Sequence, residues 1–228
     1  MTATALKPDL LGALLTRITG DAKHAPSAHS TVDVLWVLYD RILHIDPRDP
    51  EAPDRDRFLL SKGHGPAAYY AVLAAKGFIP VEWLDGLGDK DSRLGHHPDR
   101  VLIPGVEIGT GSLGHGLGLG LGVGTALGLR AQGFEARTFV LLGDAELDEG
   151  SNHEAIAYAV AARLGRLTAI VIDNQSATHG WPGGIAGRFP GWSVSLVDGH
   201  DHEAIEIALR DQKRDRPHVV VAAVESKG

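Results

Sequence analysis

Apolar and polar positions along the chain form blocks that predict strands separated by helices. Strands are predicted from short apolar runs at 58–60, 138–142, 167–172, 193–199 and 218–225. Helices are predicted from amphipathic or alanine-rich segments at 8–20, 31–43, 66–76, 80–87 and 201–212. Strands that alternate with helices give a mostly parallel sheet with helices on both faces, so we expect a three-layer α/β fold. No repeat or linker divides residues 1–228, which predicts a single domain.

A glycine-rich segment at 109–130 has two interpretations. Glycine costs up to about 1 kcal/mol per helical position relative to alanine, which is consistent with a flexible loop. Leucine, however, recurs regularly among these glycines. This periodicity favours a helix packed closely on another backbone, such as that of a second subunit.

The richest stretch for chemistry is 141–176, where two apolar runs each end in polar residues. The first run ends in Gly143-Asp144, and the second ends in Asp173-Asn174 after a segment rich in small residues. A strand, helix and strand in this order form a right-handed crossover with parallel strands. Asp144 and Asn174 are therefore predicted at neighbouring strand ends, where open α/β sheets bind ligands. A carboxylate and an amide oxygen suit Mg²⁺.

The alternative is that Gly143-Asp144 is only a turn and a helix N-cap, a role that Asp148 or Ser151 would serve as well. Asp201 is a further candidate cap, for the helix that follows it.

Composition narrows the functional classes. The chain has no cysteine, which excludes disulfides and thiolate chemistry, and its net charge of −7 argues against nucleic acid as a main partner. No apolar run approaches the length of a membrane span, and the first seven residues lack the core of a signal peptide. We therefore expect a cytoplasmic protein.

Four segments, in order, resemble the N-terminal half of transketolase over about 11–228. Residues 23–39 resemble its first motif, with His24 nine residues before Asp33. SKGHG at 61–65 resembles the Ser-x-Gly-His segment with His64, and 92–118 resembles the Gly-His-Pro and Gly-x-Leu-Gly segments. The stretch 141–176 resembles the thiamine diphosphate motif, which opens with Gly-Asp-Gly and closes about thirty residues later with Asn.

This resemblance implies a role for each matched residue. Mg²⁺ or Ca²⁺ would be held by Asp144, Asn174 and the backbone carbonyl of Ser176. Thiamine diphosphate would contact His64, Gly111, Ser112, Leu113, Gly143, Asp144, Ala145, Glu146, Asn174 and His179. The catalytic set would be His24, His64, His97 and Glu149, with His96 in place of His97 if the match shifts by one residue. Glu149 and Glu154 would lie at a subunit interface.

The resemblance also implies an activity and partners. Transketolases use thiamine diphosphate to move a two-carbon ketol unit from a ketose to an aldose, so the substrates would be sugars or sugar phosphates. In that family a second, pyrimidine-binding domain completes the site. We therefore expect a separate C-terminal subunit, a heterotetramer, and contact between two copies of this chain through the glycine-rich helix and Glu154.

Several positions depart from the family pattern. Ala145 replaces the second glycine of Gly-Asp-Gly, His115 stands where glutamine is usual, and His179-Gly180 replaces Asp-Gly. The segment before Gly191-Trp192 is also shorter. The changes at His179-Gly180 and in the shorter segment would reshape the substrate channel, whereas the cofactor site would be kept.

Two alternatives are left open. One is another thiamine diphosphate enzyme, such as a 2-oxoacid dehydrogenase component or a deoxyxylulose phosphate synthase. The other is a scaffold without catalysis.

Overall fold

The computed structural model describes residues 8–18, 25–63, 66–114 and 119–226. Its strands are β1 (Arg57–Leu60), β2 (Thr138–Gly143), β3 (Leu167–Asp173), β4 (Ser193–Asp198) and β5 (His218–Ala223). Its α-helices are α1 (Pro8–Arg17), α2 (Ala25–Val37), α3 (Pro66–Ala75), α4 (Leu119–Ala131), α5 (Gly150–Ala161) and α6 (His202–Arg210). Short helical turns are η1 (Leu38–Ile42), η2 (Val81–Gly86), η3 (Ala145–Asp148) and η4 (Ala186–Arg188). In this described part, no helix is both long and apolar enough for a membrane crossing.

The five strands form one sheet in the order β1-β2-β3-β5-β4, and every neighbouring pair is parallel. This confirms the sheet that the apolar runs predict. Gly143 on β2 is in register with Ile172 on β3. The residues that follow these two strands consequently lie side by side at the carboxyl edge of the sheet.

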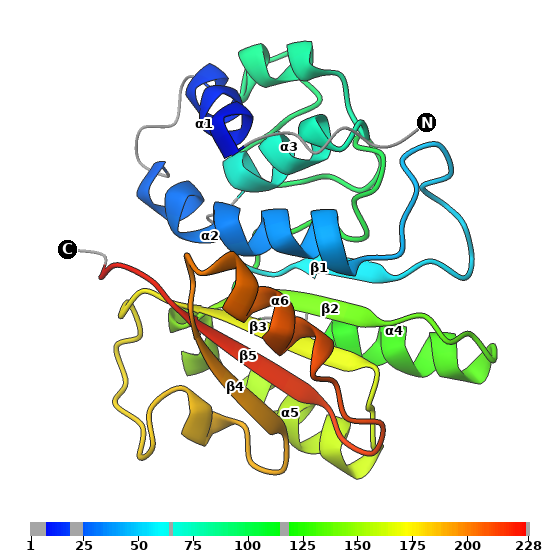
Figure 1. Cartoon of the computed structure of the whole chain (residues 1–228), viewed down its shortest axis with the longest axis vertical. Helices are drawn as coiled ribbons and strands as arrows, with labels where there is room; N and C mark the ends of the chain where they lie inside the picture. The colour runs from blue at the N-terminus through cyan, green and yellow to red at the C-terminus, as the bar shows by residue number, and fades with distance from the viewer. Residues whose placement is uncertain (1–7, 19–24, 64–65, 115–118, 227–228) are drawn as a thin grey trace.

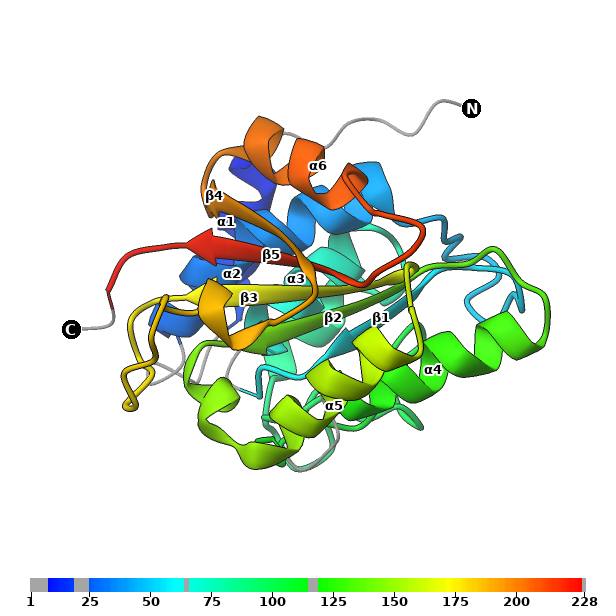
Figure 2. The same ribbon diagram turned by 90° about the horizontal axis from the view of Figure 1, so that it is seen from below.

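Successive side chains along a strand point to opposite faces of the sheet and pack in two separate hydrophobic cores. On β2, Phe139 and Leu141 pack in the core beneath α2, α3 and α6, whereas Val140 and Leu142 pack in the core beneath α4 and α5. This division follows from the two-residue period of a strand. Figures 1 and 2 show the resulting three layers, with the sheet between the two groups of helices. The predicted three-layer α/β fold is confirmed.

The second helix differs from its prediction. It begins at Ala25 rather than at residue 31, and Asp33 lies inside it rather than at its start. Pro26 is compatible with a first helical turn because the N–H that proline lacks has no helical partner there. Asp33 accepts hydrogen bonds from His200 Nδ1 and His202 Nε2, at 2.8 Å each, and so joins α2 to the start of α6.

The glycine-rich segment is helical in its second part. The described residues 109–114 form a loop, and α4 covers Leu119–Ala131. A β-carbon added to Gly122 would lie 2.2 Å from Val140 Cγ2, so this glycine allows α4 to lie close on the sheet. Gly124 and Gly128 instead border open space. Among the three glycines of α4 whose surroundings are described, Gly122 brings the helix onto its own sheet, and contact with a second subunit stays a prediction.

Candidate functional site

Asp144 and Asn174 lie together at the carboxyl edge of the sheet. Asp144 directly follows β2, and Asn174 directly follows β3. The Asp144 N–H donates to the Ile172 carbonyl at 3.0 Å, which fixes the two strand ends against each other. Both side chains are buried, with 1% of Asp144 and 5% of Asn174 exposed. A buried carboxylate and a buried amide at adjacent strand ends are the arrangement that the sequence predicts.

The loop after β3 folds back onto the Asp144 carboxylate. The Ser176 N–H donates to Asp144 Oδ2 at 2.6 Å, and the Ser176 hydroxyl donates to Oδ1 at 2.5 Å. The Ala145 N–H also donates to Oδ1, at 2.9 Å. Gln175 adopts a φ of 58°, a left-handed conformation that is costly for a residue other than glycine. Such backbone strain is concentrated at functional sites in proteins.

One atom of this site has no protein partner. Asn174 Oδ1 is buried and accepts no hydrogen bond among the described residues. An unpaired buried acceptor costs about 1–3 kcal/mol unless something else satisfies it. A divalent cation beside Asp144 would satisfy it, because Mg²⁺ and Ca²⁺ prefer oxygen ligands. The residues present therefore fit a hard cation.

The protein alone offers a partial set of metal ligands. The described ranges contain no group of three or more histidine, cysteine, aspartate or glutamate side chains arranged to hold a metal ion. One carboxylate, one amide and one backbone carbonyl leave coordination positions for phosphate and water. Mg²⁺ is commonly bound in this manner, through one or two carboxylates together with phosphates.

Glu146 joins three segments beneath this site. It is 1% exposed and accepts a hydrogen bond from the Ser61 hydroxyl. Burial raises the pKa of the Glu146 carboxyl, although hydrogen bonds from Ser61 and from the backbone of Gly114 and Gly143 oppose that rise. The sequence predicts Glu146 as a cofactor contact. In the structure it links the end of β1 to the glycine loop and the end of β2.

Lys62 is a residue of this region that the sequence analysis did not single out. Its side chain is buried, and Nζ donates to the Thr31 hydroxyl at 2.8 Å. A β-carbon added to Gly143 would lie 3.5 Å from Lys62 Cγ, so the lysine stem runs beside the residue preceding Asp144. The signal was present in SKGHG, since a lysine directly after a buried strand must either reach solvent or find partners.

The structure separates His97 from its neighbour His96. A β-carbon on Gly111 would lie 3.0 Å from His97 Cδ2, and one on Gly63 would lie 3.7 Å from His97 Cε1. His97 therefore packs between the Ser-x-Gly-His and Gly-x-Leu-Gly segments. His96 instead lies against Gly88. This geometry favours His97 as the residue that faces the site.

The glycine loop at 111–114 lies against the start of α5. Gly114 has a φ of +63°, and a β-carbon there would lie 2.1 Å from Glu149 Cβ, so only glycine fits. Ser112 and Leu113 are exposed beside it, as are Glu149 and Glu154. Their exposure leaves these side chains accessible to a cofactor or to another subunit.

The segment after Ser176 is held by Asp148 rather than left loose. Asp148 Oδ2 accepts from the Thr178 N–H at 3.0 Å, and Oδ1 accepts from Arg188 Nη1 at 2.8 Å. Arg188 Nη2 donates to the His179 carbonyl at 2.6 Å. Asp144 caps η3, since its side chain accepts from the Ala145 N–H, which confirms the turn-and-cap alternative for that residue. Neither Asp148 nor Ser151 caps α5, because its cap is Glu149, which makes no side-chain hydrogen bond there. The predicted Asp201 cap of α6 is confirmed.

The ion pair between Asp148 and Arg188 predicts that the stability of the fold falls in acid. Burial raises the Asp148 pKa, but hydrogen bonds from Arg188 and Thr178 outweigh it and hold the pKa at about 2, below the usual 3.8. A depressed native pKa stabilises the fold above about pH 4, and the contribution disappears as the pH falls towards 2. We expect the unfolding temperature of Asp148→Asn to fall less than that of the natural chain as the pH is lowered from about 4 to 2. Asp91→Asn, which changes an exposed residue, is the control and should keep the pH dependence of the natural chain. The same pH dependence in Asp148→Asn would contradict the prediction.

Three predicted or noted histidines, His24, His64 and His115, lie outside the described residues. Among the described ones, Asp144, Ala145, Asn174 and Ser176 come together, and Glu146 lies directly beneath them. Gly111 and His97 form a second group with Gly63. His179 has an exposed side chain and contributes backbone contacts to Asp148 and Arg188. The roles of these residues towards a cofactor stay predictions.

Comparisons with known proteins agree with this geometry. Residues 18–225 match the family model described as "Transketolase, thiamine diphosphate binding domain". A Rhodococcoides fascians protein named "Ferredoxin fas2" is 57% identical over 97% of this chain and 73% of its own length. An apulose-4-phosphate transketolase subunit of Actinobacillus succinogenes is 38% identical over 87% of this chain and 75% of its own. The solved transketolase of Campylobacter jejuni superposes with a TM-score of 0.78 at 25% identity, covering 96% of this chain and 38% of that one. The chain therefore belongs to the transketolase family and contains its thiamine diphosphate binding domain.

Proposed function

We propose that this chain is the diphosphate-binding subunit of a two-component transketolase. It would transfer a two-carbon ketol unit from a ketose donor to an aldose acceptor. The observation that carries the proposal is the buried Asp144 carboxylate beside the unpartnered Asn174 Oδ1 at adjacent strand ends. When bound, thiamine diphosphate supplies the carbon chemistry, and the protein supplies orientation and proton transfer.

The residues take roles that follow from their positions. Asp144, Asn174 and the Ser176 carbonyl would hold Mg²⁺ or Ca²⁺, which would anchor the diphosphate near the Ala145 backbone. His97 lies between two glycine segments at the same edge and would donate or accept a proton near the substrate. Glu146, whose carboxylate accepts from the Ser61 hydroxyl, would hold the end of β1 against the end of β2 under the site.

A separate subunit is proposed as the source of the pyrimidine-binding domain. Support comes from the Actinobacillus succinogenes relative, which is itself named as one subunit of a transketolase and of which this chain covers 75%. Two copies of this chain would meet across α4 and α5. Gly124 and Gly128 leave room there, Glu154 is exposed, and 56% of Tyr158 is exposed on the same side of the sheet.

An iron–sulfur function does not transfer from the relative named as a ferredoxin. Such clusters are held mainly by cysteine thiolates, and this chain has no cysteine. The proposal for this chain therefore rests on its thiamine diphosphate site and not on the name of that relative.

Turnover of hydroxypyruvate with an aldose acceptor tests the proposal. We expect product from this chain mixed with a candidate pyrimidine-domain subunit, and none from either chain alone. Pyruvate in place of hydroxypyruvate should give no ketol transfer. Decarboxylation of pyruvate, with or without transfer of its two-carbon unit to the aldose, would favour the 2-oxoacid dehydrogenase or deoxyxylulose phosphate synthase class. Stable binding of the two chains without any turnover would favour the scaffold alternative.

A further inference from the structure

An arginine-lined pocket lies at the amino edge of the sheet, opposite to Asp144. It has a volume of about 200 Å³ and is formed by the end of α4, the turn from α5 into β3, and the loop before β5. Arg130, Arg163, Arg166 and Arg214 surround it and are called the arginine cluster below. At about 3.3 Å per residue, the seven residues of β3 place the cluster roughly 20 Å from Asn174.

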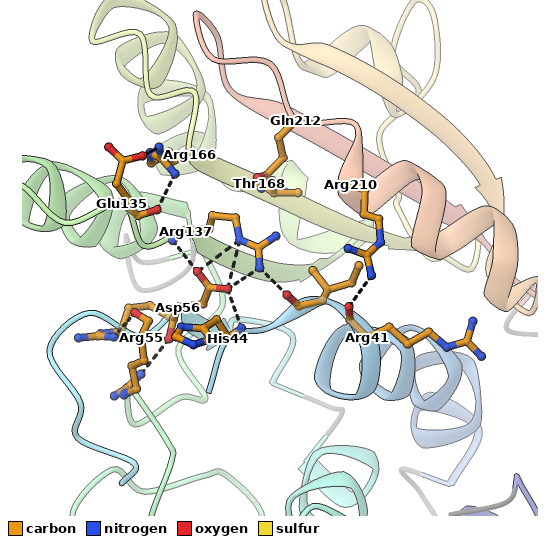
Figure 3. A network of polar contacts seen from close by, with 12 residues as sticks. Arg41, His44, Arg55, Asp56, Glu135, Arg137, Arg166, Thr168, Arg210 and Gln212 are labelled. Carbon is orange, nitrogen blue, oxygen red and sulfur yellow. Dashed lines mark hydrogen bonds and ion pairs between the residues drawn. The ribbon is translucent and has the colours of Figure 1, made fainter. Parts of the chain in front are cut away.

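Positive charge is concentrated here in an otherwise acidic chain. The segments 129–137, 162–166 and 210–216 contain eight lysine and arginine residues but three aspartate and glutamate residues. The whole chain has 22 lysine and arginine residues and 29 aspartate and glutamate residues. A second hollow lined by Arg210, Gln212 and Lys213 adjoins the pocket and shares Arg166 and Arg214 with it. Figure 3 shows Arg166, Gln212 and Arg210 along this edge.

Backbone contacts hold the arginine cluster in place. Arg130 Nη1 donates to the Ala162 carbonyl at 2.7 Å, and Arg166 Nη1 donates to the Glu135 carbonyl. A β-carbon on Gly165 would lie 2.2 Å from the Arg214 carbonyl oxygen, so the loop before β5 is packed tightly on the start of β3. The fold therefore sets the guanidinium positions of Arg130 and Arg166 and the backbone position of Arg214.

Arg163 occupies a backbone position that normally belongs to glycine. Helices α4 and α5 end in the same hydrogen-bonded motif, with Gly133 and Arg163 at equivalent left-handed positions, at φ values of 77° and 51°. Both residues line the pocket. The left-handed conformation costs arginine roughly 1–2 kcal/mol that it does not cost glycine. Arg163 thus lines the pocket although its backbone conformation is less favourable for arginine than for glycine.

The charges at the pocket do not cancel. Glu135 is the single carboxylate in its lining and pairs with Arg166. The two helix C-termini add about half a negative charge each. Four guanidinium charges, less the Glu135 charge and the two half charges, leave about two positive charges among the lining groups, and Asp215 beside the pocket interacts electrostatically with Arg163. Arg163 and Arg214 form no ion pair with any other described residue, so their donors can meet an anion.

We propose that the arginine cluster binds a small, multiply charged phosphate-bearing ligand. Guanidinium groups bind phosphate oxygens in pairs of parallel hydrogen bonds. Leu164 and Ala126 supply a buried apolar surface, and Phe134 lies partly exposed beside them, which suits the organic part of such a ligand. The site is separate from the proposed cofactor site and does not depend on it.

Calorimetric titration of the full chain with inorganic pyrophosphate in EDTA tests this site. Without a divalent cation the Asp144 carboxylate repels the probe, so one binding event is expected, at the arginine cluster. Arg163→Gly and Arg214→Ser should each weaken it about tenfold, since each removes charge-assisted hydrogen bonds. Arg216→Ser is the matched control, because Arg216 lies in the same segment and pairs with Asp215 outside the pocket.

Thermal unfolding of Arg163→Gly separates binding from a structural role. If arginine serves mainly to neutralise the end of α5, its removal should lower the unfolding temperature. If it serves to bind an anion, glycine should relieve backbone strain, and the unfolding temperature should stay equal or rise. No pyrophosphate binding by the natural chain, equal binding by Arg163→Gly, or a clear loss of stability in Arg163→Gly would each overturn the proposal.

Discussion

Replacing Asp144 with asparagine is expected to weaken magnesium-dependent binding of thiamine diphosphate by at least about 100-fold. Asp144 is the only carboxylate in the proposed ligand set. Residues that merely support a metal ligand already change metal affinity by about 10–100-fold when mutated. Losing the charged ligand itself should cost no less, which corresponds to about 2.7 kcal/mol of binding free energy or more. The asparagine keeps the shape and its single oxygen can still accept from the Ala145 N–H and the Ser176 hydroxyl, but its NH₂ group then faces the N–H groups of Ser176 and Ala177.

Calorimetry with and without Mg²⁺, on this chain and on its mixture with a pyrimidine-domain subunit, measures that loss. Asp173→Asn is the matched control. It removes a carboxylate from the end of the neighbouring strand β3, and because Asp173 directly precedes Asn174, the two side chains project from opposite faces of that strand. Asp173→Asn should bind as the natural chain does. Tight, magnesium-dependent binding by Asp144→Asn would remove Asp144 from the metal site.

The sheet was predictable because its strands are short apolar runs with helical segments between them. Parallel pairing then follows from the connections, and the positions of Asp144 and Asn174 follow from parallel pairing. The start of α2 was missed because residues 25–30 contain no run of large apolar side chains, and the contact that ties this helix to α6 joins Asp33 to His200 and His202 about 170 residues away. Local sequence does not reveal such a distant partner.

The same limit explains what was missed in the candidate sites. Asp148 looks like a helix cap in sequence, but its partners Thr178 and Arg188 come from the loop after β3. The arginine cluster is assembled from three segments that meet because three parallel strands begin at one edge. Each segment alone resembles an ordinary solvated turn.

Asp56→Asn is expected to lower the free energy of unfolding by about 3–5 kcal/mol, out of the 5–15 typical of a domain. Asp56 is 3% exposed and accepts from the His44 N–H at 2.8 Å and from the Arg137 N–H at 2.7 Å. Arg137 Nη2 donates to Asp56 Oδ2 at 2.6 Å and also to the Ile42 carbonyl (Figure 3). One carboxylate thus joins the end of η1 to the starts of β1 and β2. An amide would place an NH₂ donor against the donors of Arg137.

Urea unfolding measures this loss, and Asp54→Asn is its control, because Asp54 lies two residues earlier and is exposed. The control should change stability by less than about 0.5 kcal/mol, as surface substitutions usually do. Because Asp56 lies at the amino edge of the sheet, the folded fraction of Asp56→Asn should still bind thiamine diphosphate normally. A variant as stable as the natural chain would show that the pair contributes little. Lost cofactor binding in a fully folded variant would show that the two edges of the sheet are coupled.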